Sequence, residues 1–64
     1  MKYDRLLILI RRQQQGMTQH DCAAAAGMSI RQWQKYESGE SEPLIGAYIK
    51  IIDALGIDFT DLLR

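Results

Sequence analysis

Residues 18–39 read TQHDCAAAAGMSIRQWQKYESG, and the helix-capping residues in this stretch decide the fold. Thr18 is a good N-cap residue, and Asp21 three positions later completes an acidic variant of the capping box. Four successive alanines follow, and alanine has the highest helix propensity. Gly27 can then adopt the left-handed conformation with which many helices end. The first half of the stretch therefore predicts a helix over residues 19–26.

A second short helix follows, with its own cap and its own stop. Ser29 can accept the N-cap hydrogen bond and Gly39 can close the helix, which predicts helix over residues 30–38. Ala23 and Ala26 have small side chains, so the two helices can cross closely. Two short helices joined by a glycine-containing turn form a helix-turn-helix motif.

Apolar residues at helical spacing predict further helices on both sides of this motif. The first should span residues 2–14 and end near Gly16. Pro43 suits the first position of a helix after the motif, which Gly56 should stop. A last short helix would follow, with Asp58 as its cap. The three apolar sets are Tyr3, Leu6, Leu7 and Ile10; Leu44, Tyr48, Ile51, Ile52 and Leu55; and Ile57, Phe59, Leu62 and Leu63.

A chain of 64 residues forms one domain at most, because a domain of this size buries only about 60% of the surface of its unfolded chain. We therefore expect residues 1–64 to form a single compact all-α domain of five helices around one core. Tyr36 should also be a core residue, since stacking on bases is unusual in the recognition of duplex DNA. The residues expected to join the helices are Leu6, Ile10, Ala23, Met28, Trp33, Tyr48, Ile52 and Leu55.

The composition is that of a globular protein, with 47% apolar and 25% charged residues. Cys22 is the single cysteine and His20 the single histidine, so we expect no disulfide, no metal site and no cofactor. We interpret Cys22 as a small buried apolar residue and His20 as an exposed one. The longest apolar run, residues 6–10, is far shorter than the ~18 residues of a membrane span. It is also shorter than the core of a secretory signal, so we expect a cytoplasmic protein without a membrane partner.

The formal net charge is zero, but the charges are distributed unevenly along the chain. Residues 1–36 hold six bases and two acids, a net charge of +4. Residues 37–64 hold two bases and six acids, a net charge of −4. This asymmetry fits one basic face on an otherwise acidic protein, and a solvated mixture of surface charges is the alternative.

The outer side of the second motif helix carries side chains that can read DNA bases. Met28 and Trp33 should anchor the motif to the core and leave the opposite side of this helix exposed. Arginine and lysine can read guanine, glutamine can read adenine or grip phosphate, and isoleucine can lie against a thymine methyl group. A merely solubilising role is the alternative for the two bases. The residues on the outer side are Ile30, Arg31, Gln32, Gln34 and Lys35.

The order and spacing of these features resemble the lambda-repressor-like helix-turn-helix family, also called the Xre or Cro family. The resemblance covers about residues 5–63. It implies sequence-specific binding of double-stranded DNA by a small transcriptional regulator, typically a repressor, whose second motif helix enters the major groove. The matching positions are Thr18-Gln19, Ala23, Gly27-Met28-Ser29, Trp33, Tyr36-Glu37, Gly39, Pro43, Ala54-Leu55-Gly56-Ile57 and Leu62-Leu63.

The resemblance also implies roles for individual residues. The position of Gln19 contacts a backbone phosphate and often braces the recognition helix, and that of Ser38 often contacts phosphate. The position of Glu37 is usually structural, so we leave it outside the DNA site. The positions that usually face base edges are those of Ile30, Arg31 and Lys35.

Three features depart from the family pattern. Cys22 stands where many relatives have leucine, which predicts looser helix packing. Ile30 is apolar where polar residues are frequent, so one hydrogen bond to a base is lost. Glu40 and Glu42 place acids in a loop that lies near DNA in many relatives, which would weaken binding by repulsion; the alternative is that this exposed loop points away from DNA.

An enzyme is not expected, because the sequence has no glycine-rich phosphate loop and no serine or cysteine with a base beside it. The rival function is a protein-interaction module of the same fold, for example an antitoxin-like protein that binds its partner through the acidic second half. We expect no small-molecule effector. We also expect a homodimer through the C-terminal third, because one small domain offers few DNA contacts. Its exposed apolar patch would consist of Ile57, Phe59, Leu62 and Leu63, and the alternative is that they cap the monomer's own core.

Overall fold

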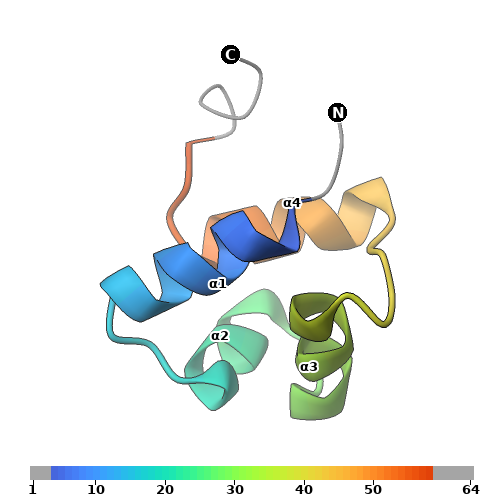
Figure 1. Cartoon of the computed structure of the whole chain (residues 1–64), viewed down its shortest axis with the longest axis horizontal. Coiled ribbons are helices and arrows are strands. Elements are labelled where there is room, and N and C mark those ends of the chain that lie inside the picture. The colour runs from blue at the N-terminus through green and yellow to red at the C-terminus, as the bar shows by residue number, and fades with distance from the viewer. Residues whose placement is uncertain (1–3, 59–64) are drawn as a thin grey trace.

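The computed structural model describes residues 4–58, and within them the chain forms four α-helices and no strand (Figure 1). Figure 1 shows α1 and α4 in an upper layer and α2 and α3 in a lower one. Helix α2 packs against both α3 and α4, and α1 packs against α3. None of the helices in residues 4–58 is long and apolar enough to cross a membrane. The helices are α1 (Arg5–Gln14), α2 (Gln19–Ala26), α3 (Ile30–Ser38) and α4 (Ile45–Ala54).

The all-α class is therefore confirmed, while the count of five helices is not. The described residues form four helices, and the predicted last helix falls mostly on residues 59–64, outside the described part of the chain. Ile57 and Asp58 precede that segment and are not helical.

The two motif helices have the bounds that their capping residues predict. The Thr18 hydroxyl accepts a hydrogen bond from the Asp21 backbone N–H at 3.0 Å, and the Asp21 carboxylate accepts one from the Thr18 N–H at 3.0 Å. The Ser29 hydroxyl accepts from the backbone N–H three residues later at 3.1 Å. Gly27 and Gly39 end α2 and α3 in the left-handed conformation, with φ of 70° and 85°. Local hydrogen bonds thus define both helices.

Two predicted helix starts were wrong. Helix α1 begins at Arg5 instead of residue 2, because the Asp4 carboxylate caps it by accepting hydrogen bonds from two backbone N–H groups at 3.1 and 3.3 Å. Helix α4 begins at Ile45 instead of Pro43. Pro43 is buried, and Leu44 after it has the extended conformation of an N-cap residue without any side-chain capping bond.

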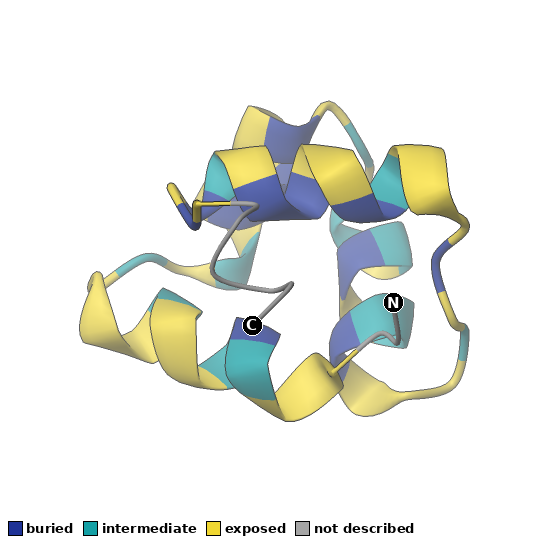
Figure 2. Cartoon of the chain, turned by 90° about the horizontal axis from the view of Figure 1, so that it is seen from above, coloured by how far each residue is buried: buried dark blue, intermediate teal, exposed yellow. Residues whose placement is uncertain are grey.

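Most of the predicted core residues are buried, and the two on α1 are not (Figure 2). Leu6 and Ile10 are 54% and 50% exposed, whereas Ile8 is 1% exposed. The apolar period on α1 was misleading because Arg12, one turn after Ile8, also lies on the inner side and forms a buried ion pair. The buried core residues are Ile8, Cys22, Ala23, Ala26, Trp33, Tyr48, Ile51, Ile52, Leu55 and Ile57, with Met28 and Tyr36 packed against them.

Candidate nucleic-acid interface

The orientation of α3 follows from which of its residues are buried. Trp33 and Glu37 are buried, and they lie one turn apart on the helix. Successive residues of an α-helix rotate by about 100° around the axis, so the second and sixth positions of α3, Arg31 and Lys35, lie opposite Trp33 and out of the core. Residues on this side are exposed or half-buried: Arg31, Gln34, Lys35 and Ser38.

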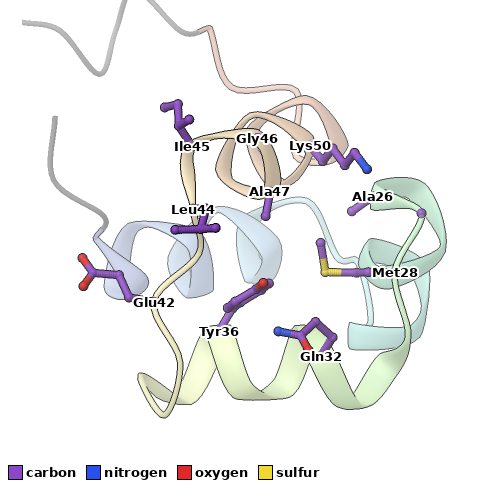
Figure 3. Close-up of a pocket in the computed structure, with 11 residues that line it drawn as sticks. Ala26, Met28, Gln32, Tyr36, Glu42, Leu44, Ile45, Gly46, Ala47 and Lys50 are labelled. Carbon is purple, nitrogen blue, oxygen red and sulfur yellow. The ribbon is translucent and has the colours of Figure 1, made fainter.

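The other three predicted site residues lie at the margins of this side. Ile30 is the first residue of α3 and is half-buried. Gln32 is half-buried and lines a groove between α3 and α4 together with Tyr36 (Figure 3). Gln19 is the first residue of α2 and is half-buried beside α3. The structure thus brings four of the seven residues onto one side of α3 and places three around it.

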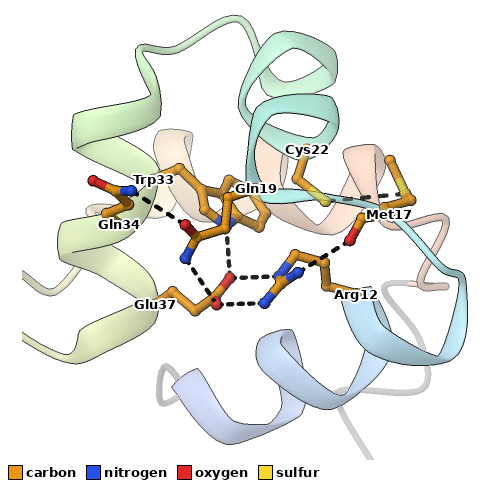
Figure 4. Close-up of polar contacts among 7 residues, drawn as sticks. All are labelled: Arg12, Met17, Gln19, Cys22, Trp33, Gln34 and Glu37. Atoms are coloured by element: carbon orange, nitrogen blue, oxygen red, sulfur yellow. Dashed lines mark hydrogen bonds and ion pairs between the residues drawn. The ribbon is translucent and has the colours of Figure 1, made fainter.

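A buried ion pair joins α1 to α3 behind this side (Figure 4). Both guanidinium nitrogens of Arg12 that face Glu37 donate to its carboxylate, Nε to Oε2 and Nη2 to Oε1, each at 2.9 Å. Arg12 Nη1 also donates to the Met17 carbonyl at 3.0 Å, and the Trp33 indole N–H donates to Glu37 Oε2 at 2.7 Å. Such bidentate, charge-assisted bonds fix both distance and angle. They therefore set how α3 sits on α1.

The protonation states of the pair follow from these contacts. Burial raises the pKa of Glu37, but hydrogen bonds from Arg12, Trp33 and Gln19 outweigh it and hold that pKa below its ordinary value. The hydrogen bond to Glu37 raises the pKa of Arg12. Both groups are therefore charged at neutral pH, and the ion pair is present under ordinary conditions.

Gln19 extends this network to the surface of α3. Its Nε2 donates to Glu37 Oε1 at 3.2 Å, and its Oε1 accepts from Gln34 Nε2 at 3.2 Å. The Gln19 amide thus bridges the inner and outer sides of α3 from the start of α2 (Figure 4). This hydrogen bond directs the Gln34 side chain along the protein surface toward Gln19.

The family model described as Helix-turn-helix matches residues 8–62 of the chain. The chain belongs to the lambda-repressor-like (Xre) helix-turn-helix family. This is a family of DNA-binding regulators and not a family of enzymes. Comparisons with curated proteins and with solved structures give no match.

Two basic residues that support the helix-turn-helix were missed in the sequence. Arg12 was assigned neither to the core nor to the site, because its partner Glu37 lies 25 residues later in the chain. Arg5 lies against the C-terminal end of α3: a Cβ atom added at Gly39 would be 2.8 Å from its Cδ. A cation there interacts favourably with the carbonyl end of the helix dipole. Gly39 is thus required both by its left-handed φ and by this close approach.

Proposed function

We propose that the protein binds a specific sequence of double-stranded DNA by placing α3 in the major groove. The observation that carries this proposal is the outer side of α3, where Arg31 and Lys35 stand with Gln34 and Ser38 opposite the buried Trp33. An α-helix fits the major groove, and a recognition helix needs several such side chains on one side. The Arg12–Glu37 pair supports the proposal because it holds this helix in one orientation.

The residues divide into base-reading and phosphate-binding groups. Arg31 and Lys35 can donate to guanine acceptors, and Ile30 at the start of α3 can contact a thymine methyl group. Gln32 lines the groove beside α4, so in this proposal it would reach bases only at that margin. Gln19 opens α2, and its side-chain amide can donate to a phosphate there, while Ser38 at the end of α3 can donate to another.

We further propose that the protein acts as a repressor in the cytoplasm. A bound copy occupies DNA that a polymerase would otherwise use, and this steric effect needs no other surface of the protein. Its occupancy would then depend on its own concentration, without a small-molecule effector. The exposed acids Glu40 and Glu42 lie between α3 and α4 and would reduce affinity by repelling phosphates.

Selection of bound sequences from a random duplex library tests sequence-specific binding. We expect one short consensus sequence for the wild type and none for the Arg31→Ala/Lys35→Ala double variant. Arg11→Ala is the matched control, because Arg11 is an exposed base in the last turn of α1 and should leave the consensus unchanged. An unenriched pool with the wild-type protein at low salt would contradict the proposal.

The second candidate is a protein-interaction module of the same fold. Exposed apolar residues at the start of α4, Leu44 and Ile45, together with the acids Glu40 and Glu42, favour it. A duplex-DNA column separates the two functions. Retention at low salt that is lost on adding salt supports DNA binding, whereas no retention at low salt supports the interaction module.

A further inference from the structure

The side chain of Arg5 crosses the C-terminal end of α3, and Gly39 leaves the room for it. A Cβ atom added at Gly39 would be 2.8 Å from Arg5 Cδ, 3.0 Å from Nε and 3.8 Å from Cζ. In Figure 1 the beginning of α1 lies above this end of α3. A side chain at position 39 would displace the guanidinium group, so the glycine keeps Arg5 in this place.

Gly39 continues the line of Arg31 and Lys35 along α3. The three positions are four residues apart, and residues at this spacing are neighbours on one side of a helix. Arg5 thus adds a third cation at the end of the side proposed to face DNA, although it comes from another helix. Since a helix rises by about 1.5 Å per residue, this side is about 12 Å long from Arg31 to Gly39.

Helix stability alone does not account for a cation at this position. Arg5 is the first residue of α1, and a positive charge is unfavourable at the N-terminal, positive end of the helix dipole. The carbonyl end of α3 offsets that cost by an interaction of similar size. Arg5 is exposed and makes no ion pair within residues 4–58. Its charge is therefore available to a ligand.

Ser38 also lies at this end of α3, but its hydroxyl proton is already used within the protein. The hydroxyl donates to the Lys35 carbonyl at 3.2 Å and accepts from the Glu40 N–H at 3.3 Å. A phosphate contact in which Ser38 donates would break the first of these bonds. An anion at this end of α3 thus needs a charged donor, and Arg5 is a cation that lies there.

From this arrangement we infer that the Arg5 guanidinium binds a backbone phosphate of DNA. The N-terminal residues of a recognition helix contact base edges, and the major groove is about 12 Å wide. The end of α3, about 12 Å from Arg31, then lies at the edge of the groove, beside the phosphates. A guanidinium group suits a phosphate because it can donate two parallel hydrogen bonds. The inference rests on the proposed function, since it requires α3 in the major groove.

This contact accounts for the acidic loop beside the proposed DNA-binding side. Glu40 and Glu42 repel phosphates after the end of α3, and Arg5 places a positive charge at the same end. The contact fixes how α3 lies in the groove and carries no sequence information directly. Arg5 therefore positions the base-reading residues Arg31 and Lys35 without reading a base itself.

The first test measures the salt dependence of DNA binding for Arg5→Gln by fluorescence anisotropy, on the selected duplex and on a random duplex. The slope of log K against the logarithm of the salt concentration should become shallower by about 0.9, the value for one phosphate contact. Affinity for both duplexes should fall by about tenfold at low salt, because one charge-assisted hydrogen bond is lost. Arg5→Lys keeps the charge and should keep the wild-type slope.

Arg11→Gln is the matched control, since it removes an exposed positive charge from the other end of α1. It changes the net charge equally and should leave the slope unchanged. If Arg5→Gln keeps the wild-type slope, or Arg11→Gln lowers it as much, Arg5 does not bind a phosphate. A lower melting temperature of Arg5→Gln with an unchanged slope would likewise overturn the inference and leave Arg5 with a purely structural role on α3.

The second test uses Gly39→Asn to displace the Arg5 side chain without removing its charge. Asparagine tolerates the left-handed conformation of Gly39, with φ of 85°, better than most residues that have a Cβ atom. Its Cβ would meet the flexible end of Arg5, so the side chain moves and the fold is kept. The slope should fall by about 0.9, and Arg5→Gln should lower it no further in this background. A full second decrease would show that Arg5 does not act from its place over Gly39.

The inference and the proposed function fail in different ways. If Arg5→Gln binds the selected duplex with the affinity and salt slope of the wild type, the inference is wrong and the proposed function stands. If the wild-type protein binds no duplex at low salt, the proposed function is wrong, and the inference is wrong with it.

Discussion

Two contact regions hold the helices together by different means. Where α2 meets α4, the buried side chains are small or apolar, among them Ala23 and Ala26 on α2 and Ile51 and Ile52 on α4. Where α1 meets α3, the contact includes the bidentate Arg12–Glu37 pair. Apolar contacts are non-directional, and their free energy follows the buried area. Charge-assisted hydrogen bonds depend on angle, so the polar region fixes the orientation of the helix that is proposed to read DNA.

Trp33 belongs to both regions, and its removal should have the largest effect. It is 1% exposed in the apolar core and donates its indole N–H to Glu37. Trp33→Ala should lower the free energy of unfolding by roughly 3–5 kcal/mol. A domain of this size has only about 3–10 kcal/mol, so the variant should be largely unfolded by circular dichroism. A cooperative thermal transition at the wild-type temperature would show that Trp33 does not link the regions.

Removal of Arg12 should lower the free energy of unfolding more than a small truncation in the apolar region does. Arg12→Ala leaves the Glu37 carboxylate, 7% exposed, without its countercharge. Breaking a buried ion pair in this way typically costs about 3–5 kcal/mol. Ile51→Val in the apolar region should cost only about 0.5–1.5 kcal/mol. Urea unfolding of both variants measures the difference, and equal losses would remove the distinction between the regions.

The polar region should also make stability depend on pH. The folded-state pKa of Glu37 is lowered, so the stability it contributes is complete above the ordinary glutamate pKa of about 4.3. It is lost as the pH falls through the lowered folded-state value. Urea unfolding of the wild type and Glu37→Gln should therefore differ most near pH 7 and converge in strong acid. A difference that stays constant down to pH 2 would mean that the Glu37 charge is not involved.

Features of the molecule that depend on local contacts could be predicted from the sequence, and features that depend on distant contacts could not. The bounds of α2 and α3 could be predicted because Thr18 and Ser29 bond to backbone three residues away. The inner side of α1 could not, because Arg12 is buried only through Glu37, 25 residues later in the chain. The all-α class needed only helical periodicity, which also predicted Arg31, Gln34 and Lys35 outside the core but wrongly placed Ile30 and Gln32 with them instead of at the margins. The groove depends on how residues 39–44 place α4 beside α3, which no local pattern encodes.

Gln34 offers a smaller test at the edge of the polar region. Its side chain donates to Gln19 at the protein surface, so Gln34→Ala removes one exposed hydrogen bond. The free energy of unfolding should fall by no more than about 1 kcal/mol. If Gln34 supports DNA binding only by positioning Gln19, affinity should fall by similar factors for all sequences, as measured by fluorescence anisotropy on several duplexes. A change confined to one base pair would make Gln34 a base reader instead.

The most direct test of the central claim is the base preference of Arg31→Ala. Anisotropy titrations on the selected duplex should show that Arg31→Ala loses about 1–3 kcal/mol of binding free energy. Titrations on its single-base-pair variants should show a relaxed preference at one base pair. Gln19→Ala should instead weaken binding to all of these duplexes by similar factors, because a phosphate contact carries no sequence information directly. If Arg31→Ala keeps the affinity and every base preference of the wild type, α3 is not the helix that reads DNA.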